Sequence, residues 1–285
     1  MTEAGTSTLY RPSPVVLTGK ALLGGVRRVM PPAMYANFYR GVDRAYRRTV
    51  HLGYSRFWLR ERLAGNREGR ERAAAVFRSM PYSLVGWKGL EATYDAVTLI
   101  NRERIGGAIV ECGVAQGGCA ALMAATDARQ GGGRRIFLCD SYEGLPDPTA
   151  EDFEDGRTGS HASVLERGSC LGTERQVAEL LFDRFGIERS RVRMVKGWFQ
   201  DTLPGLSHEI GDVALLRIDA DWYESVKCCL ESLYDRVVDG GVVIIDDYGS
   251  CHGARRAVDE FLAAREVRVT LEHDGRGGCT FRKPR

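Results

Sequence analysis

The residues AIVECGVAQGG at 108–118 decide the fold. An apolar, strand-like run at 108–112 leads into a turn rich in glycine and then into helix-forming residues. Glycine allows the backbone of such a turn to approach a ligand closely, and the N–H groups that begin the helix point toward that ligand. Taken alone, this corner fits a plain packing role and a ligand site equally well.

Alternating strand-like and helical segments follow this corner. After the first strand at 108–112, further strand-like runs lie at 135–140, 191–195, 213–219, 241–246, 267–272 and 278–282. Helical stretches are predicted at 88–103, 117–129, 173–185, 223–236 and 253–264. This alternation predicts an α/β fold, with a mainly parallel sheet and helices on both faces.

Charge divides the chain into two parts. Residues 1–80 hold 15 Lys and Arg against 5 Asp and Glu, whereas residues 81–285 hold 25 against 33. The first part is also rich in aromatic residues, and we expect two or three short helices in 15–65 followed by a solvated link at 66–72. The second part contains an acidic loop at 143–172, whose length is typical of a lid or a binding loop.

The basic segment 1–80 could bind nucleic acid or an anionic membrane, or its arginines could pair with acidic surfaces of the protein itself. The opposite charges of the two parts favour pairing within the chain or with a neighbouring subunit. We therefore expect a homo-oligomer, a dimer or higher, with neither nucleic acid nor membrane as a partner.

Composition excludes several classes of protein. Hydrophobic residues make up 44% and charged residues 27%, which is incompatible with global disorder. No run approaches the roughly 20 apolar residues of a membrane span, and no secretion signal is recognisable. The eight cysteines form no C-x-x-C pair and show no zinc-ligand spacing. Buried thiols in a cytoplasmic protein are the expected result.

Carboxylates end several of the predicted strands. Glu111 ends the first strand, and Asp140 ends the second, where a carboxylate can accept hydrogen bonds from both hydroxyls of a ribose. The glycine spacing near Gly113 is not G-x-G-x-x-G, which argues against a nicotinamide oxidoreductase. The combination predicts a nucleoside site without a pyrophosphate, and this fits S-adenosylmethionine (SAM) better than NAD.

Four more aspartates follow two later strands: Asp219 and Asp221 after VALLRI, and Asp246 and Asp247 after GVVII. Carboxyl ends of parallel strands meet at one edge of the sheet, so these side chains should lie close together. One aspartate could simply cap a helix. Four of them are costly to bury without a positive charge, and oxygen ligands favour a hard cation such as Mg²⁺, Ca²⁺ or Mn²⁺.

The chain resembles the macrocin O-methyltransferase (TylF/MycF-like) family over about residues 83–285. The resemblance lies in the turn at 110–118, in CDSYEGLPDP at 139–148, VKGWFQDTLP at 195–204, LRIDADWYES at 216–225 and VVIIDDYGSCHGARRAVDEF at 242–261. It implies a Rossmann-like class I methyltransferase with a seven-stranded sheet. It also implies a Mg²⁺-dependent enzyme that methylates a hydroxyl of a small natural product, typically on a deoxysugar.

The same resemblance implies the roles of individual residues. Asp221 would be the general base of catalysis. The divalent ion would be held by Asp219, Asp246 and Asp247. SAM would be bound by Glu111, Gly113, Asp140, Ser141, Trp198 and Asp219.

This chain departs from the macrolide-sugar members at two motifs. Ala220 and Trp222 stand in Asp219-Ala-Asp221-Trp222, where those members read D-G-D-L, and Ala115-Gln116 replaces W-R in the first turn. Both changes lie near the acceptor side. The identity of the acceptor is therefore open at this point. The alternative is a catechol-type methyltransferase, which uses similar three-carboxylate chemistry on a vicinal aromatic diol or acts on another small natural-product hydroxyl. His161 and His252 are expected to be surface residues.

Overall fold

The computed structural model describes residues 30, 32–153, 165 and 167–285, and its centre is a seven-stranded sheet. The strand order is β3-β2-β1-β4-β5-β7-β6. The pairs that join the first five strands are parallel, and β7 runs antiparallel to both β5 and β6. The strands are β1 Ala108–Cys112, β2 Ile136–Asp140, β3 Val192–Lys196, β4 Val213–Ile218, β5 Val237–Ile245, β6 Glu272–His273 and β7 Cys279–Arg282.

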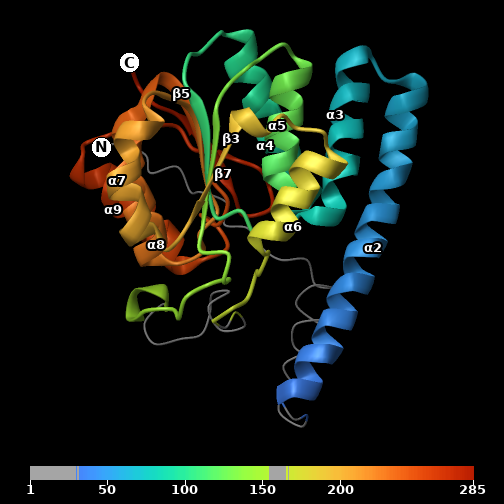
Figure 1. Cartoon of the computed structure of the whole chain (residues 1–285), viewed down its shortest axis with the longest axis horizontal. Coiled ribbons are helices and arrows are strands. Elements are labelled where there is room, and N and C mark those ends of the chain that lie inside the picture. Colours follow the sequence, from blue (N-terminus) through green and yellow to red (C-terminus); the bar gives the residue numbers. More distant parts are fainter. Residues whose placement is uncertain (1–29, 31, 154–164, 166) are drawn as a thin grey trace, which may run out of the picture.

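Helices cover both faces of this sheet (Figure 1). One face packs against α4 Gly86–Arg102, α5 Gly118–Arg129 and α6 Glu174–Ala178, through an apolar cluster around Ile109 and Leu215. The other packs against α7 Phe199–Ile210, α8 Tyr223–Leu233 and α9 His252–Ala264. Every residue of β1 and β4 is buried, as expected for the central strands of a sheet covered on both sides. The predicted seven-stranded α/β fold is therefore confirmed.

Three details of the prediction differ from the structure. The strand expected at 267–272 is only the two-residue β6, because Val267, Val269 and Leu271 pack on the core without joining the ladder. The helix expected at 173–185 is α6 followed by a wider π-helical turn, Glu179–Arg184. Helix α7 was not predicted, and Pro204 lies inside it.

The basic N-terminal segment is helical, as predicted, but its division differs. Two or three short helices were expected in 15–65, but the described part of that range contains one helix, α2 Pro32–Ala64. Residues 15–29 and 31 lie outside the described residues. The expected link at 66–72 is the start of α3 Arg67–Ser79. Asn66 caps α3, because its side chain accepts a hydrogen bond from the Gly69 N–H at 2.8 Å. Arg67, Glu68 and Arg70 of the expected link are exposed on this helix, whereas Arg72 is half-buried and pairs with Asp95 of α4.

The helices α2 and α3 share a hydrophobic cluster with the sheet-covering helices. Tyr54 of α2 and Val76 of α3 pack with Leu90 of α4 and Leu122 of α5. The Tyr54 hydroxyl also donates a hydrogen bond to Glu91 at 3.0 Å. The hydrophobic core is therefore continuous across the expected boundary at residue 80.

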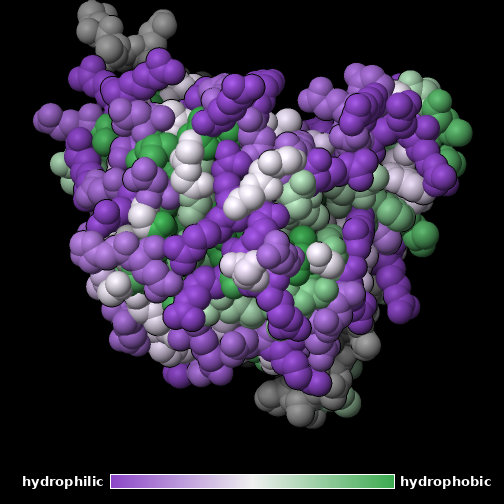
Figure 2. All heavy atoms as spheres, turned by 45° about the horizontal axis from the view of Figure 1, so that its top comes forward, coloured by the Kyte–Doolittle hydropathy of each residue, from purple (hydrophilic) through white to green (hydrophobic). Residues whose placement is uncertain are grey.

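The opposite side of α2 faces outward. Leu59 and Leu63 are exposed there, and Figure 2 shows an apolar patch at the right-hand edge, where α2 and α3 lie. The rest of that face is mostly hydrophilic. Within the described residues, no helix combines the length and apolar character needed to cross a membrane.

We predict that Tyr54→Ala destabilises the whole molecule by about 3–5 kcal/mol, because a buried aromatic ring is removed from the shared cluster. Leu63→Ala on the same helix is the matched control and should change stability by less than about 0.5 kcal/mol, since Leu63 is 77% exposed. Urea unfolding followed by circular dichroism measures both. An unchanged main transition in Tyr54→Ala would show that α2 unfolds independently of the sheet.

Candidate active site

A cavity of about 1260 Å³ opens at the carboxyl ends of the parallel strands. Its lining comes from the residues that follow β1, β2, β4 and β5, together with the start of α4 and the loop after β2. Ligands of open α/β sheets bind at this edge. A cavity of this size can hold a nucleoside cofactor beside a second small molecule.

The glycine turn after β1 packs directly against the end of β4. Gly113 has a φ of 86°, and a Cβ added to it would lie 1.8 Å from the backbone oxygen of Asp219. The Gly113 N–H donates to the Cys139 carbonyl at 2.9 Å, and the Asp219 N–H donates to the Cys112 carbonyl at 2.8 Å. Glycine is therefore required at position 113 by both its conformation and its neighbour.

Asp140, predicted to bind the ribose, also holds the glycine turn. Its Oδ2 accepts the N–H groups of Val114 and Ala115 at 2.7 and 3.1 Å, and its Oδ1 accepts that of Tyr142 at 2.6 Å. A carboxylate offers about four acceptor positions, so one remains for a ligand. Ser141 lines the cavity, but its hydroxyl donates to the Gly144 carbonyl at 3.1 Å and so serves the turn after β2.

Glu111 lies at the inner wall of the cavity and is 1% exposed. Its Oε1 is 3.5 Å from Nε of Arg217, its register partner on β4, and its Oε2 has no hydrogen-bond partner among the described residues. Burial raises the pKa of Glu111 to about 8. The predicted cofactor-binding carboxylate is therefore positioned by a buried arginine.

The predicted metal ligands meet at the adjoining rim of the sheet. One carboxylate oxygen from each of Asp219, Asp246 and Asp247 lies within 4.8 Å of the others. Arg217 donates to Asp219 at 3.0 Å and to Asp246 at 2.9 Å, and Arg276 donates to the second oxygen of Asp246 at 2.8 Å. Two guanidinium groups thus supply part of the positive charge that the acidic rim requires.

The remaining carboxylates are less well compensated. Asp247 accepts the Ser250 hydroxyl at 3.0 Å through Oδ1, but its buried Oδ2 has no hydrogen-bond partner among the described residues. Burial and neighbouring carboxylates raise the pKa of Asp247 to about 6, and the same causes raise the pKa values of Asp219 and Asp221 well above the usual range. The excess negative charge and the unpartnered oxygen fit a divalent cation.

Asp221 extends from the turn between β4 and α8 into the same cavity. Its φ is 54°, a left-handed conformation that costs a non-glycine residue about 1–3 kcal/mol and that often occurs at functional sites. Its Oδ1 lies 3.9 Å from the Sγ of the Cys251 thiol. The carboxylate predicted to act as base therefore has no strong hydrogen bond of its own in the described structure.

The structure brings all nine predicted site residues to this cavity, including Trp198 at the start of α7. His252, expected at the surface, is half-buried and is not among the described lining residues, and His161 lies outside the described residues. Neither Arg217 nor Arg276 was predicted from the sequence. Arg217 carried a usable signal, since an arginine inside the apolar strand VALLRI needs a buried acidic partner.

The strand order, the glycine turn held by Asp140 and the acidic rim define a class I SAM-dependent methyltransferase. The model of the family described as "Macrocin-O-methyltransferase (TylF)" matches residues 24–283. The chain belongs to this O-methyltransferase family.

Three similar proteins carry specific descriptions. Demethyldecarbamoylnovobiocin O-methyltransferase of Streptomyces niveus is 35% identical over 68% of this chain and 74% of its own length. The 8-demethyl-8-(2,3-dimethoxy-alpha-L-rhamnosyl)-tetracenomycin-C 4'-O-methyltransferase of Streptomyces olivaceus is 34% identical over 70% and 75%. The solved O-methyltransferase NovP is 33% identical, with a TM-score of 0.63 over 72% of this chain and 83% of that protein.

We predict that Arg217→Met destabilises the protein by about 3–5 kcal/mol, because it leaves Glu111, Asp219 and Asp246 without their shared buried counter-charge. The matched control is Arg193→Met on β3, whose side chain is 59% exposed in its contact with Glu209 and should contribute less than about 1 kcal/mol. Urea midpoints at neutral pH compare the two variants. Equal midpoints would mean that Arg217 is not the electrostatic support of the rim.

Proposed function

We propose that this enzyme transfers a methyl group from SAM to a hydroxyl of a sugar or glycosylated natural product, with the help of a divalent cation, Mg²⁺. The observation that carries the proposal is that two sets of residues line the same cavity. One set is the glycine turn with Asp140, and the other is the acidic rim of Asp219, Asp246 and Asp247. Family membership supports the reaction type.

The donor side would be formed by the first two strand ends. Asp140 retains one acceptor position for a ribose hydroxyl, and Gly113 allows the backbone to come close to the cofactor. Glu111 adds a carboxylate oxygen without a hydrogen-bond partner at the inner wall, and Trp198 adds an aromatic surface. When bound there, SAM supplies an electrophilic methyl group on its sulfonium.

The acidic rim would hold the cation. Asp219 and Asp247 each offer a carboxylate oxygen that accepts no hydrogen bond from an arginine of the described residues, and Asp246 keeps unshared lone pairs beside its two guanidinium partners. When bound, such an ion lowers the pKa of an acceptor hydroxyl and neutralises part of the negative charge.

Asp221 would accept the proton of the acceptor hydroxyl. Burial and neighbouring carboxylates raise the pKa of Asp221, and a carboxylate with a raised pKa is a stronger base once it is ionised. Its position in the same cavity as the donor residues supports this role. Holding donor, acceptor and base together removes much of the entropic barrier to transfer.

A sugar acceptor is supported by the relatives. The Streptomyces olivaceus enzyme is named for methylation at the 4' position of a rhamnosyl group, and the chain aligns with 75% of that enzyme. No observation of the described site favours a catechol as the acceptor, so vicinal aromatic diols are compared with sugars in the experiment below.

We predict methyl transfer from SAM to rhamnosides or other deoxysugar glycosides in the presence of Mg²⁺. Mass spectrometry would detect the gain of one methyl group, and vicinal aromatic diols would be tested in parallel. Treatment with EDTA should abolish activity, and added Mg²⁺ should restore it. Full activity after EDTA treatment would refute the cation role, and preference for the diols would replace the sugar with a catechol.

Replacement of the proposed base tests its role separately. We predict that Asp221→Asn lowers kcat by about 10²–10⁴-fold, because the amide cannot accept the hydroxyl proton as a carboxylate does. SAM binding, measured by calorimetry, should remain. The matched control is Asp201→Asn on α7, which is absent from the cavity lining and should keep kcat. Unchanged kcat in Asp221→Asn would rule out this residue as the base.

A further inference from the structure

Cys251 is a buried nucleophilic group beside the active site for which the proposed reaction has no use. It is 3% exposed and precedes helix α9. The chain turns back sharply between β5 and α9, because the Cys251 N–H donates to the Asp247 carbonyl at 2.9 Å. This turn places Sγ 3.9 Å from Oδ1 of Asp221.

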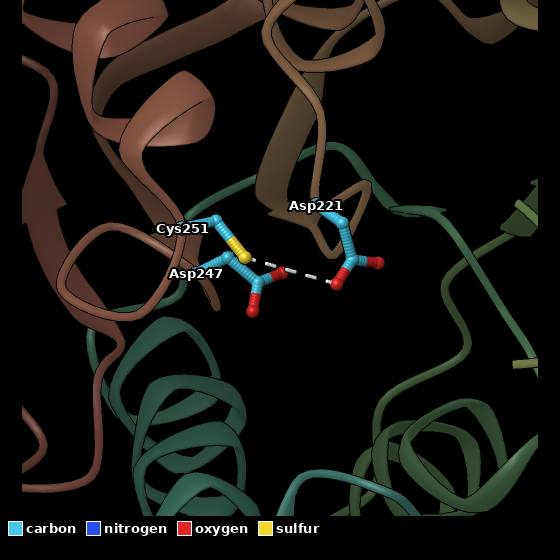
Figure 3. Close-up of side chains that lie close together, drawn as sticks. All are labelled: Asp221, Asp247 and Cys251. Carbon is cyan, nitrogen blue, oxygen red and sulfur yellow. Dashed lines mark hydrogen bonds between the residues drawn. The ribbon is translucent and has the colours of Figure 1, made fainter. Parts of the chain in front are cut away.

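The thiol and two carboxylates form a second ligand-sized group. One oxygen each from Asp221 and Asp247 and the Sγ of Cys251 lie within 4.8 Å of one another. Figure 3 shows the three side chains converging, with the Asp247 carboxylate near the line that joins Sγ to Asp221. This group shares Asp247 with the acidic rim but contains neither Asp219 nor Asp246.

One member of this group carries a buried polar atom without a hydrogen-bond partner in the described structure, and it is the same oxygen that the acidic rim offers to a cation. Asp247 is only 7% exposed, and its buried Oδ2 has no hydrogen-bond partner among the described residues. A buried carboxylate oxygen without a partner costs free energy that native structures rarely leave uncompensated. The thiol is a weak donor, and its long contact goes to Asp221 rather than to this oxygen.

The composition of the group selects a different ion from that expected at the acidic rim. Mg²⁺ prefers oxygen ligands, whereas a cysteine sulfur favours softer ions such as Zn²⁺ or Cd²⁺. Zinc sites with three protein ligands and one open position are common. The eight cysteines all lie in the described part of the chain, and among them Cys251 alone belongs to such a group with carboxylates.

We propose that Asp221, Asp247 and Cys251 form a site for a soft divalent cation, Zn²⁺ or Cd²⁺, adjacent to the acidic rim. On binding, the metal–sulfur bond replaces the S–H bond of Cys251, and one proton passes to solvent without any change of oxidation state. The ion would also occupy a carboxylate oxygen of Asp221 and draw Asp247 away from the rim. Inhibition of methyl transfer is the consequence, and only this consequence rests on the proposed function.

The binding test uses the full chain without SAM or Mg²⁺. Titration with Cd²⁺ should produce the ultraviolet charge-transfer band of a cadmium–thiolate bond, with one ion bound and at least one proton, that of the thiol, released per chain. Cys251→Ser and Cys251→Ala should both lose this band, and Asp221→Asn should weaken Cd²⁺ binding by at least about tenfold. The matched control is Cys228→Ser, which removes a half-buried thiol of α8 that lines the same cavity but lies outside the group, and it should keep the band.

The inhibition test adds Zn²⁺ to enzyme supplied with Mg²⁺ and SAM. The parent enzyme and Cys228→Ser should be inhibited at equal Zn²⁺ concentrations. Cys251→Ser, compared with its own activity without Zn²⁺, should require at least about tenfold more.

The two proposals fail in different ways. Absence of the Cd²⁺ band in the parent protein, or its persistence in both folded Cys251 variants, would overturn the soft-metal site whatever the activity. A Cys251-dependent band in a protein without methyltransferase activity would instead support the site and refute the proposed function. Circular dichroism of each variant tests whether the variant is folded.

Discussion

The positive charge of Arg217, buried at the centre of the sheet, is the interaction on which the candidate site depends. Its side chain is fully buried and contacts Glu111, Asp219 and Asp246, which come from three adjacent strand ends. Carboxylates are costly to bury without such a partner. Arg276 adds a second positive charge at Asp246 from the segment before β7. The two arginines compensate only part of the acidic charge, which leaves the rim suited to a further cation.

The main chain fixes the distance between the proposed SAM-binding residues and the acidic rim. After a register shift near their start, strands β1, β4 and β5 pair without interruption to their carboxyl ends. The ladder continues beyond these ends, because the Asp246 N–H donates to the Ile218 carbonyl at 2.9 Å. The side chains that follow these strands therefore meet at one edge of the sheet. The rigid elements of the fold thus hold groups that the proposed reaction needs at close distance.

Much of the fold was predictable from the sequence. The central strands are fully buried on both faces and therefore stand out in the sequence as short, mainly apolar runs. The carboxylates at strand ends were also predictable, since parallel strands carry successive motifs to the same edge. The edge strand β6 and the long helix α2 were not, because their extent depends on tertiary contacts that local periodicity does not encode. The ion pair of Arg276 was missed for a similar reason, because Arg276 lies 30 residues after Asp246 in the chain and nothing local links them. Arg217, in contrast, could have been recognised from its position inside an apolar strand.

The contact between Gly113 and the backbone oxygen of Asp219 has a wider consequence. No side chain separates the two segments, so the first turn and the end of β4 behave as one rigid block. In the proposed reaction, the distance between the residues that would bind SAM and the acidic rim is thereby set by the main chain and not by side-chain rotamers. The walls of the cavity at the start of α4 and in the loop after β2 could therefore differ between acceptors without changing this distance.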